Sequence, residues 1–383
     1  MQFKLPSLLA GAFLAAALLI GCGGKAKDPT FESAEYKSSK AEVTSRYVAS
    51  YDAKQAVKTM KEVKGKRVFV PLFQVEFINS SSASSSSYSI SSGNSSSVKV
   101  SYKLTGVDTA NFIAIVNNLY NEFVGELKTA GYDVISKEEL LATPQYQQQM
   151  KLGEKSNPIQ LASRLEGNNY ALVVAPTGMG VVYFNGFAVA PSAVKTVWKA
   201  LSGSMPDAMT AALADSLKAT PVLAQYVVGF ATLNDKHVKG SGNSQVSAAF
   251  NFTIAAAHSK VAFVGEKGIV KNGKNKNRWM LNGINGSAQL SKPIFGSKGW
   301  ATGTRDITST GTKIGEGVGA ALSTLAALSG SGGGSTNSSK TRVYALDVNQ
   351  DLYVARAQEN LAYAQQMLVY GLTHDGIQQY KAK

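Results

Sequence analysis

The stretch KRVFVPLFQVEF, residues 66–77, is the segment that decides the fold. Its Val and Phe side chains favour a strand, and we expect a central strand in spite of Pro71. The clearest helix of the sequence comes after it, with Phe112, Val116 and Leu119 at three- and four-residue steps and Gly131 closing the pattern. A strand followed by an amphipathic helix predicts a sheet with helices packed on it.

The residues after this helix continue the alternation. Residues 132–135 indicate a short strand, and Ser136 with Glu139 forms a capping box that starts a further helix. Residues 159–165 are interpreted as a helix and 170–175 as a buried strand. Alternating strands and helices predict the α/β class, a layered sheet with packed helices.

Further elements are expected on either side of this block. A helix is predicted at residues 41–64, a final one at 352–372, and strands at 222–233, 246–257 and 260–264. In 246–257, Val246, Ala248, Phe250, Phe252 and Ile254 share one face at period two.

The length of 383 residues suggests two domains or one elaborated domain. We expect an α/β domain at 41–310, with a flexible Ser-rich loop at 79–97 and an apolar insertion at 184–221. A Gly/Ala/Ser-rich segment with a flexible linker is expected at 311–340, with a helix at 318–328, and a carboxyl-terminal helical segment at 341–383.

The first residues predict export. Residues 1–21 have the short apolar region of a signal peptide, too short to span a bilayer as a helix. Leu19-Ile20-Gly21-Cys22 looks like a lipobox, in which Cys22 is lipidated and becomes the mature amino terminus. Gly23 in place of an Asp favours the outer membrane over the inner one. Residues 22–40 are predicted to be a polar tether, and the chain is expected in the periplasm or on the cell surface.

Composition limits the chemistry. The chain holds one Cys and three His, none of them at metal-ligand spacing, so no metal site is predicted. The Gly-rich stretches lack the context of a nucleotide site, so no cofactor is predicted either. No catalytic residue is proposed, although a Ser-based site is left open. The net charge of +14 fits anionic lipid or polysaccharide, and nucleic acid, which charge alone does not exclude, is not an expected partner.

Two groups of residues are candidate contact sites. A basic turn holds Lys271, Lys274, Lys276 and Arg278 and would contact anionic surfaces; the alternative is a solvated turn. Three aromatic residues of the insertion would bind a partner, or else belong to the core: Phe184, Phe187 and Trp198.

Residues 66–175 resemble the anticodon-binding-like fold of envelope lipoproteins of the CsgG, PelC and LpoB kind and of the amino-terminal domain of TolB. The resemblance rests on KRVFVPLF, the helix after it, the strand GYDVI at 131–135 and the capped helix at Ser136. The strands of residues 246–265 are similar too. Such proteins are mostly not enzymes and several form rings that export or assemble envelope polymers, so the resemblance implies a homo-oligomer or an envelope protein partner and transfers no functional residue.

The expected function is therefore that of a non-catalytic outer-membrane lipoprotein, an envelope assembly, secretion or scaffold component that forms oligomers. One alternative is a periplasmic hydrolase or polymer-binding enzyme. Another is a secretion pore of ringed subunits, for which residues 246–257 supply one candidate lipid-facing strand.

Overall fold

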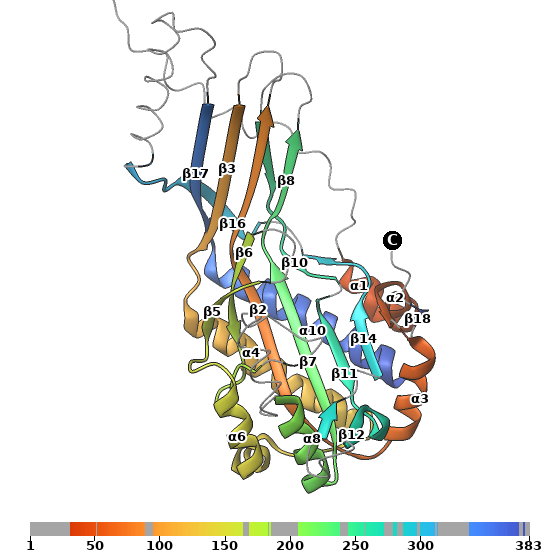
Figure 1. Cartoon of the computed structure of the whole chain (residues 1–383). Coiled ribbons are helices and arrows are strands. Elements are labelled where there is room, and N and C mark those ends of the chain that lie inside the picture. Colours follow the sequence, from red (N-terminus) through yellow and green to blue (C-terminus); the bar gives the residue numbers. More distant parts are fainter. Residues whose placement is uncertain are drawn as a thin grey trace, which may run out of the picture.

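The protein is represented by a computed structural model that describes residues 31–50, 52–88, 95–163, 168–182, 184, 206–237, 244–256, 258–271, 279–281, 286–296, 299–310, 312, 337–374 and 378–379. These residues form a large mixed sheet with helices packed on it, which confirms the layered α/β class (Figure 1).

Strand β2 (Arg67–Tyr88) is the centre of this sheet, as the sequence predicted. It pairs in parallel with β7 (Thr220–Gly229) and antiparallel with β6 (Asn168–Val174). Its register with β7 shifts between Phe69 and Leu72, where Pro71 lies. A proline lacks the N–H that a ladder needs, and an irregularity of this kind is where a sheet accommodates one.

The main path of the sheet runs in the order β16, β17, β3, β2, β7, β11, β14, β1, β18. Its remaining members on this path are β16 (Ala301–Asp306), β17 (Asn337–Val348), β3 (Ser95–Thr105), β11 (Lys260–Phe263), β14 (Gly286–Leu290), β1 (Val48–Ser50) and β18 (Gln378–Gln379). Off the path lie β4 (Asp133–Val134), β5 (Ile159–Ala162), β10 (Thr253–Ile254) and β15 (Ile294–Phe295). Two separate strand pairs join β8 (Thr232–His237) to β9 (Ser244–Ala249) and β12 (Ile269–Lys271) to β13 (Trp279–Leu281).

Helices α4 (Thr109–Thr129) and α10 (Gln350–Thr373) are the two long helices that the apolar periodicity predicted. They pack on each other, and α4 places its aromatic rings against β2. The ring centroids of Phe77 and Phe112 lie 4.6 Å apart, and those of Phe73 and Phe123 lie 5.4 Å apart. These four rings are buried and form the middle of the core.

Shorter helices complete the fold. The capping box is confirmed at α5 (Lys137–Ala142), where the backbone N–H of Glu139 donates to Ser136 Oγ over 3.0 Å. The other helices are α1 (Ser33–Ser38), α2 (Lys40–Tyr47), α3 (Ala53–Val63), α6 (Pro144–Leu152), α8 (Pro206–Leu217) and the 3₁₀ turn η2 (Glu266–Gly268).

The Ser-rich segment corrects the largest prediction. Of the expected flexible loop at 79–97, residues 80–88 continue β2 and residues 95–97 begin β3, and the two strands pair antiparallel from Ser80↔Lys103 to Tyr88↔Ser95. Backbone hydrogen bonds hold a strand whatever its side chains are, and β3 is paired on both sides. Low hydrophobicity alone was therefore a misleading signal here.

Three local predictions were also wrong. Residues 159–162 are strand β5, paired with β6, and not a helix. The expected helix at 41–64 is broken into α2 and α3 by β1, which pairs with β14. The expected strand at 246–257 is divided into β9 and β10, which belong to different sheets.

The boundaries of the tether and of the carboxyl-terminal segment also change. Phe31 and Tyr36 of the expected tether are buried in the core, so residues 31–40 belong to the folded body. Strand β17 starts at Asn337, inside the expected 311–340 segment, and pairs in parallel with β3 along its length. The carboxyl-terminal segment is thus a strand and a helix of the same α/β body. The helix predicted at 318–328 lies outside the described residues.

Candidate functional site: the protruding ribbon

The most distinctive part of the molecule is a ribbon that extends past the helices (Figure 1). We call the ribbon the strands β3, β16 and β17 together with residues 80–88 of β2. Strand β6 ends its pairing with β2 at Ser82, so six further residues of β2 run on for about 20 Å. Strand β16 is the last strand of the sheet on its side, and its residues Thr302 to Asp306 are exposed.

One face of the ribbon is apolar and covered. Val100 is buried, Tyr102 and Val98 are half-buried, and β8 and β9 pack over this face. The ring of Tyr102 stacks on Tyr344 of β17, with centroids 5.3 Å apart, and meets Phe250 edge-on at 5.0 Å. Burial, and next the neighbouring Tyr344, raise the pKa of Tyr102. This face holds the ribbon to the strand pair β8–β9.

The opposite face is polar. On β2 the side chains of Ser84 and Ser86 are exposed, and on β3 those of Lys99 and Lys103 are exposed. Ser84 pairs directly with Lys99, so hydroxyl and ammonium groups lie side by side on this face. Because β2 and β3 are paired in register, these groups are presented on a regular backbone rather than on a loop.

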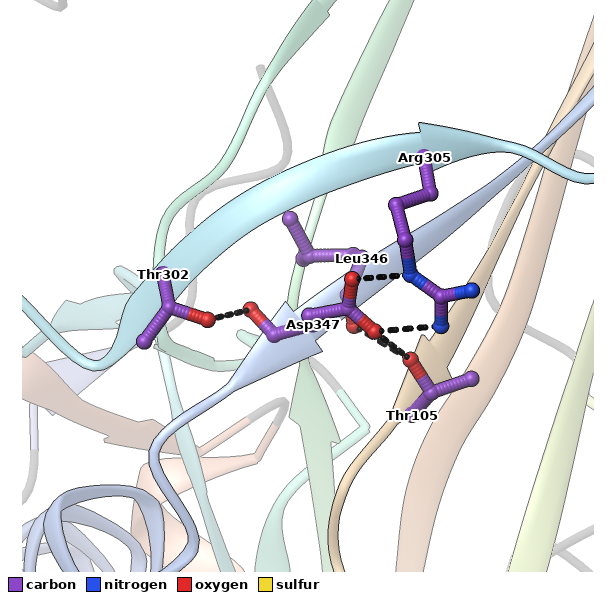
Figure 2. A network of polar contacts seen from close by, with 5 residues as sticks. All are labelled: Thr105, Thr302, Arg305, Leu346 and Asp347. Carbon is purple, nitrogen blue, oxygen red and sulfur yellow. Dashed lines mark hydrogen bonds and ion pairs between the residues drawn. The ribbon is translucent and has the colours of Figure 1, made fainter.

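A polar network fixes the base of the ribbon (Figure 2). Arg305 of β16 donates from Nε to Asp347 Oδ2 over 2.6 Å and from Nη2 to Asp347 Oδ1 over 2.8 Å. Thr105 Oγ1 of β3 donates to the same Oδ1 over 2.8 Å, and Thr302 Oγ1 donates to the backbone oxygen of Asp347 over 3.0 Å. The network thus ties three strands together through one carboxylate.

The electrostatics of this network follow from its hydrogen bonds. The bonds from Arg305 and then from Thr105 lower the pKa of Asp347 to about 2, and the carboxylate raises the pKa of Arg305. The bidentate geometry is one that only a guanidinium provides. Since Arg305 neutralises Asp347, Lys99 and Lys103 keep the exposed face positive.

The basic turn is only partly within the described residues. Lys271 ends β12, whose pairing with β13 runs from Ile269↔Leu281 to Lys271↔Trp279. The chain between these two strands, residues 272–278, is therefore the turn of an antiparallel hairpin, as the sequence indicated. Lys274, Lys276 and Arg278 lie outside the described residues.

The aromatic candidates of the insertion are not brought together. Phe184 is only 4 % exposed and belongs to the hydrophobic core, so it is not a partner-binding residue on the surface. It follows the buried Val181 and Val182 and packs with them because an apolar run after β6 has the sheet beside it. Phe187, Trp198 and the lipidation site Cys22 lie outside the described residues.

The strand proposed to face lipid is also corrected. Phe252 and Ile254 are fully buried and Phe250 packs on Tyr102, so the period-two apolar face of residues 246–254 points into the protein. It is a core face and not a lipid-facing one.

Sequence reasoning missed the ribbon. A usable signal was the alternation of Val98, Val100, Tyr102 and Leu104 with polar residues, and that of Arg342, Tyr344 and Leu346 in the carboxyl-terminal segment. Both alternations have the period of a strand with one covered face. No sequence pattern indicates that Arg305 and Asp347 meet.

Other classes of site were sought in the part of the chain that the structure describes. There, no three His, Cys, Asp or Glu side chains gather in a way that could hold a metal ion. No helix in the same residues has the length and apolar character to cross a membrane. Comparisons with protein-family models, with curated proteins and with solved structures find no match.

Proposed function

We propose that this chain is a non-catalytic outer-membrane lipoprotein, anchored through Cys22, that serves as an assembly, secretion or scaffold component of the envelope and binds its partner through the ribbon. The lipobox residues support the anchor. The order of elements from β2 to β6, with its resemblance to ring-forming envelope lipoproteins, supports the assembly role.

The ribbon is the single observation that carries this proposal. Its outer strands continue past the helices, where Ser side chains bury little apolar surface and add little to the stability of the body. A long extension of this kind is accounted for if it contacts something else. Backbone groups at an open strand edge and a polar, positively charged face are both suited to a partner that brings strands or acidic groups.

The charge selects among partners. Lys99 and Lys103 are exposed on the outer face, and the one carboxylate of the basal network is neutralised by Arg305. Acidic envelope polymer, an envelope protein or a second copy of this chain can each meet such a surface, because positive potential and free backbone groups both attract them.

The test is site-specific photo-cross-linking in cells. A photo-reactive amino acid replaces Ser84, which is exposed on the ribbon, and in a matched control it replaces Lys151, which is exposed on α6. We expect adducts from position 84 and none from position 151, and we expect Cys22→Ser to abolish them because the unanchored chain leaves the membrane. The mass of the adduct separates a second copy from another protein or a polymer. Equal adducts at both positions, or none at either, would refute the proposal.

A further inference from the structure

The first described residues of the chain are docked on the body through aromatic contacts. We call residues 31–47, with helices α1 and α2, the arm. The backbone N–H of Phe31 donates to the oxygen of Phe295 over 3.0 Å. The rings of Phe31 and Tyr36 lie 5.3 Å and 5.6 Å from that of Tyr363 on α10. Val43 is also buried, so the arm is part of the core in this state.

A carboxyl group lies beneath the arm. Glu126 of α4 accepts a hydrogen bond at Oε1 from Gln365 Nε2 of α10 over 3.2 Å. Its other oxygen, Oε2, is buried and has no hydrogen-bond partner among the described residues, and the same holds for Gln365 Oε1 and the hydroxyl of Tyr226. An under-satisfied buried group of this kind is costly, above all when it is charged.

The groups around Glu126 come from every element that faces it. The arm contributes Tyr36 and Lys40, β7 contributes Tyr226, and α4 itself contributes Glu122. Lys40 lies with its Nζ 5.8 Å from the ring of Tyr36 and 5.0 Å from that of Tyr370. Tyr36 is further influenced by Thr44, Tyr363 and Tyr370.

Burial is the main effect on the carboxyl. It raises the pKa of Glu126 from 4.5 to about 7, while the hydrogen bond from Gln365 and the charge of Lys40 act in the opposite direction and Glu122 adds to the rise. In turn, burial and then the Glu126 charge raise the pKa of Tyr36 and of Tyr226. The charged form of Glu126 is therefore disfavoured as long as the arm covers it.

We propose that the arm is a latch, closed over a protonated Glu126 and loosened when this carboxyl group ionises. Release of the arm gives the carboxylate access to water, so ionisation favours release. The docked state binds the proton more tightly than the released state. Docking is therefore strongest below pH 4.5 and weakens as the pH rises through 7, by up to about 300-fold for a shift from 4.5 to 7.

The latch changes how far the body can be from its anchor. From Cys22 to Phe31 the chain spans at most about 30 Å, and with the arm released the span from Cys22 to Tyr47 is about 85 Å. This consequence rests on the lipid anchor of the proposed function. The latch itself does not, so it is tested in a full chain that carries Cys22→Ser and no other thiol.

The experiment is thiol labelling of a buried cysteine. Val43→Cys places the thiol in the arm, and Val261→Cys, which is fully buried in β11, reports opening of the body. Labelling rates from pH 5 to pH 8.5 are corrected with a model thiol for the fraction of thiolate. Each probe is combined with wild-type Glu126, with Glu126→Gln and with Glu42→Gln, the last a matched change at an exposed carboxylate of the arm.

We expect the corrected rate at position 43 to rise by ten-fold or more between pH 5.5 and pH 8, and to rise equally in Glu42→Gln. Glu126→Gln should remove the rise, and position 261 should show none in any background. A flat profile at position 43, a rise that persists in Glu126→Gln, or a parallel rise at position 261 would overturn the latch. None of these outcomes depends on whether the chain is lipidated.

Discussion

The Ser-rich part of β2 can be tested with one proline. Ser81 is buried and pairs with Tyr102 of β3 on one side and with Asn169 of β6 on the other. Its backbone N–H therefore faces a strand in either direction, and Ser81→Pro removes that donor. In a flexible loop the same change would restrict the unfolded chain and stabilise the protein by about 0.4–1 kcal/mol.

The two interpretations thus differ in sign. In the sheet, the carbonyl that loses its donor is left unsatisfied, which costs about 1–3 kcal/mol. Converted to an equilibrium, the ribbon should open about 5- to 150-fold more often than in the wild type. Strain from the proline ring adds to this cost, because a proline in the middle of a sheet also forces a bulge.

Hydrogen exchange of backbone amides measures this opening directly. Peptides from β2 and β3 should lose protection in Ser81→Pro, whereas peptides from α10 should keep it. Ser81→Ala, which keeps the N–H, is the control and should exchange within about two-fold of the wild type. Exchange in the ribbon that is unchanged or slower with proline would refute the assignment of this segment to the sheet.

Three other predictions concern the anchor, the basic turn and the oligomer. Fatty-acid labelling should mark the wild type and not Cys22→Ser, which should also leave the outer-membrane fraction; equal labelling would contradict lipidation. Each cation near an anionic surface contributes about 1 kcal/mol, so changing the four basic residues of the turn to Gln should weaken binding to anionic liposomes more than ten-fold at low salt with little change in melting temperature; those residues are Lys271, Lys274, Lys276 and Arg278. Mass photometry of detergent-extracted protein should show several subunits, and a strictly monomeric mass at micromolar concentration would contradict a ring.

The helices were predictable because their signals are local. The apolar period of α4 and the hydrogen bond from Glu139 N–H to Ser136 lie within a few residues of sequence. Strand β2 was recognised for the same reason, since its first half is a run of Val and Phe. The layered α/β class follows from these elements together.

The ribbon could not be found in this way, because its partners lie far apart in the sequence. The Ser side chains of β2 and β3 carry no apolar signal, and their order comes from backbone pairing with β6 and β17. Strand β5 was missed for a similar reason: its four residues pair with β6, and too short a window was left to separate the periods of helix and strand. The meeting of Arg305 with Asp347 depends on the pairing of β16 with β17 and leaves no mark in the sequence.

The parallel pairing of β3 with β17 has a consequence for biogenesis. Thr105 and Leu346, which are joined across these strands, are 241 residues apart in the chain. During export from the amino terminus, residues 80–105 emerge long before the strand that completes their sheet, so one edge of β3 stays unpaired for most of synthesis. An apolar strand in that position would be a template for aggregation. A strand made largely of Ser holds few apolar groups to associate and remains hydrated until β17 arrives, so the composition that hides the ribbon in the sequence also protects it while it waits for its partner.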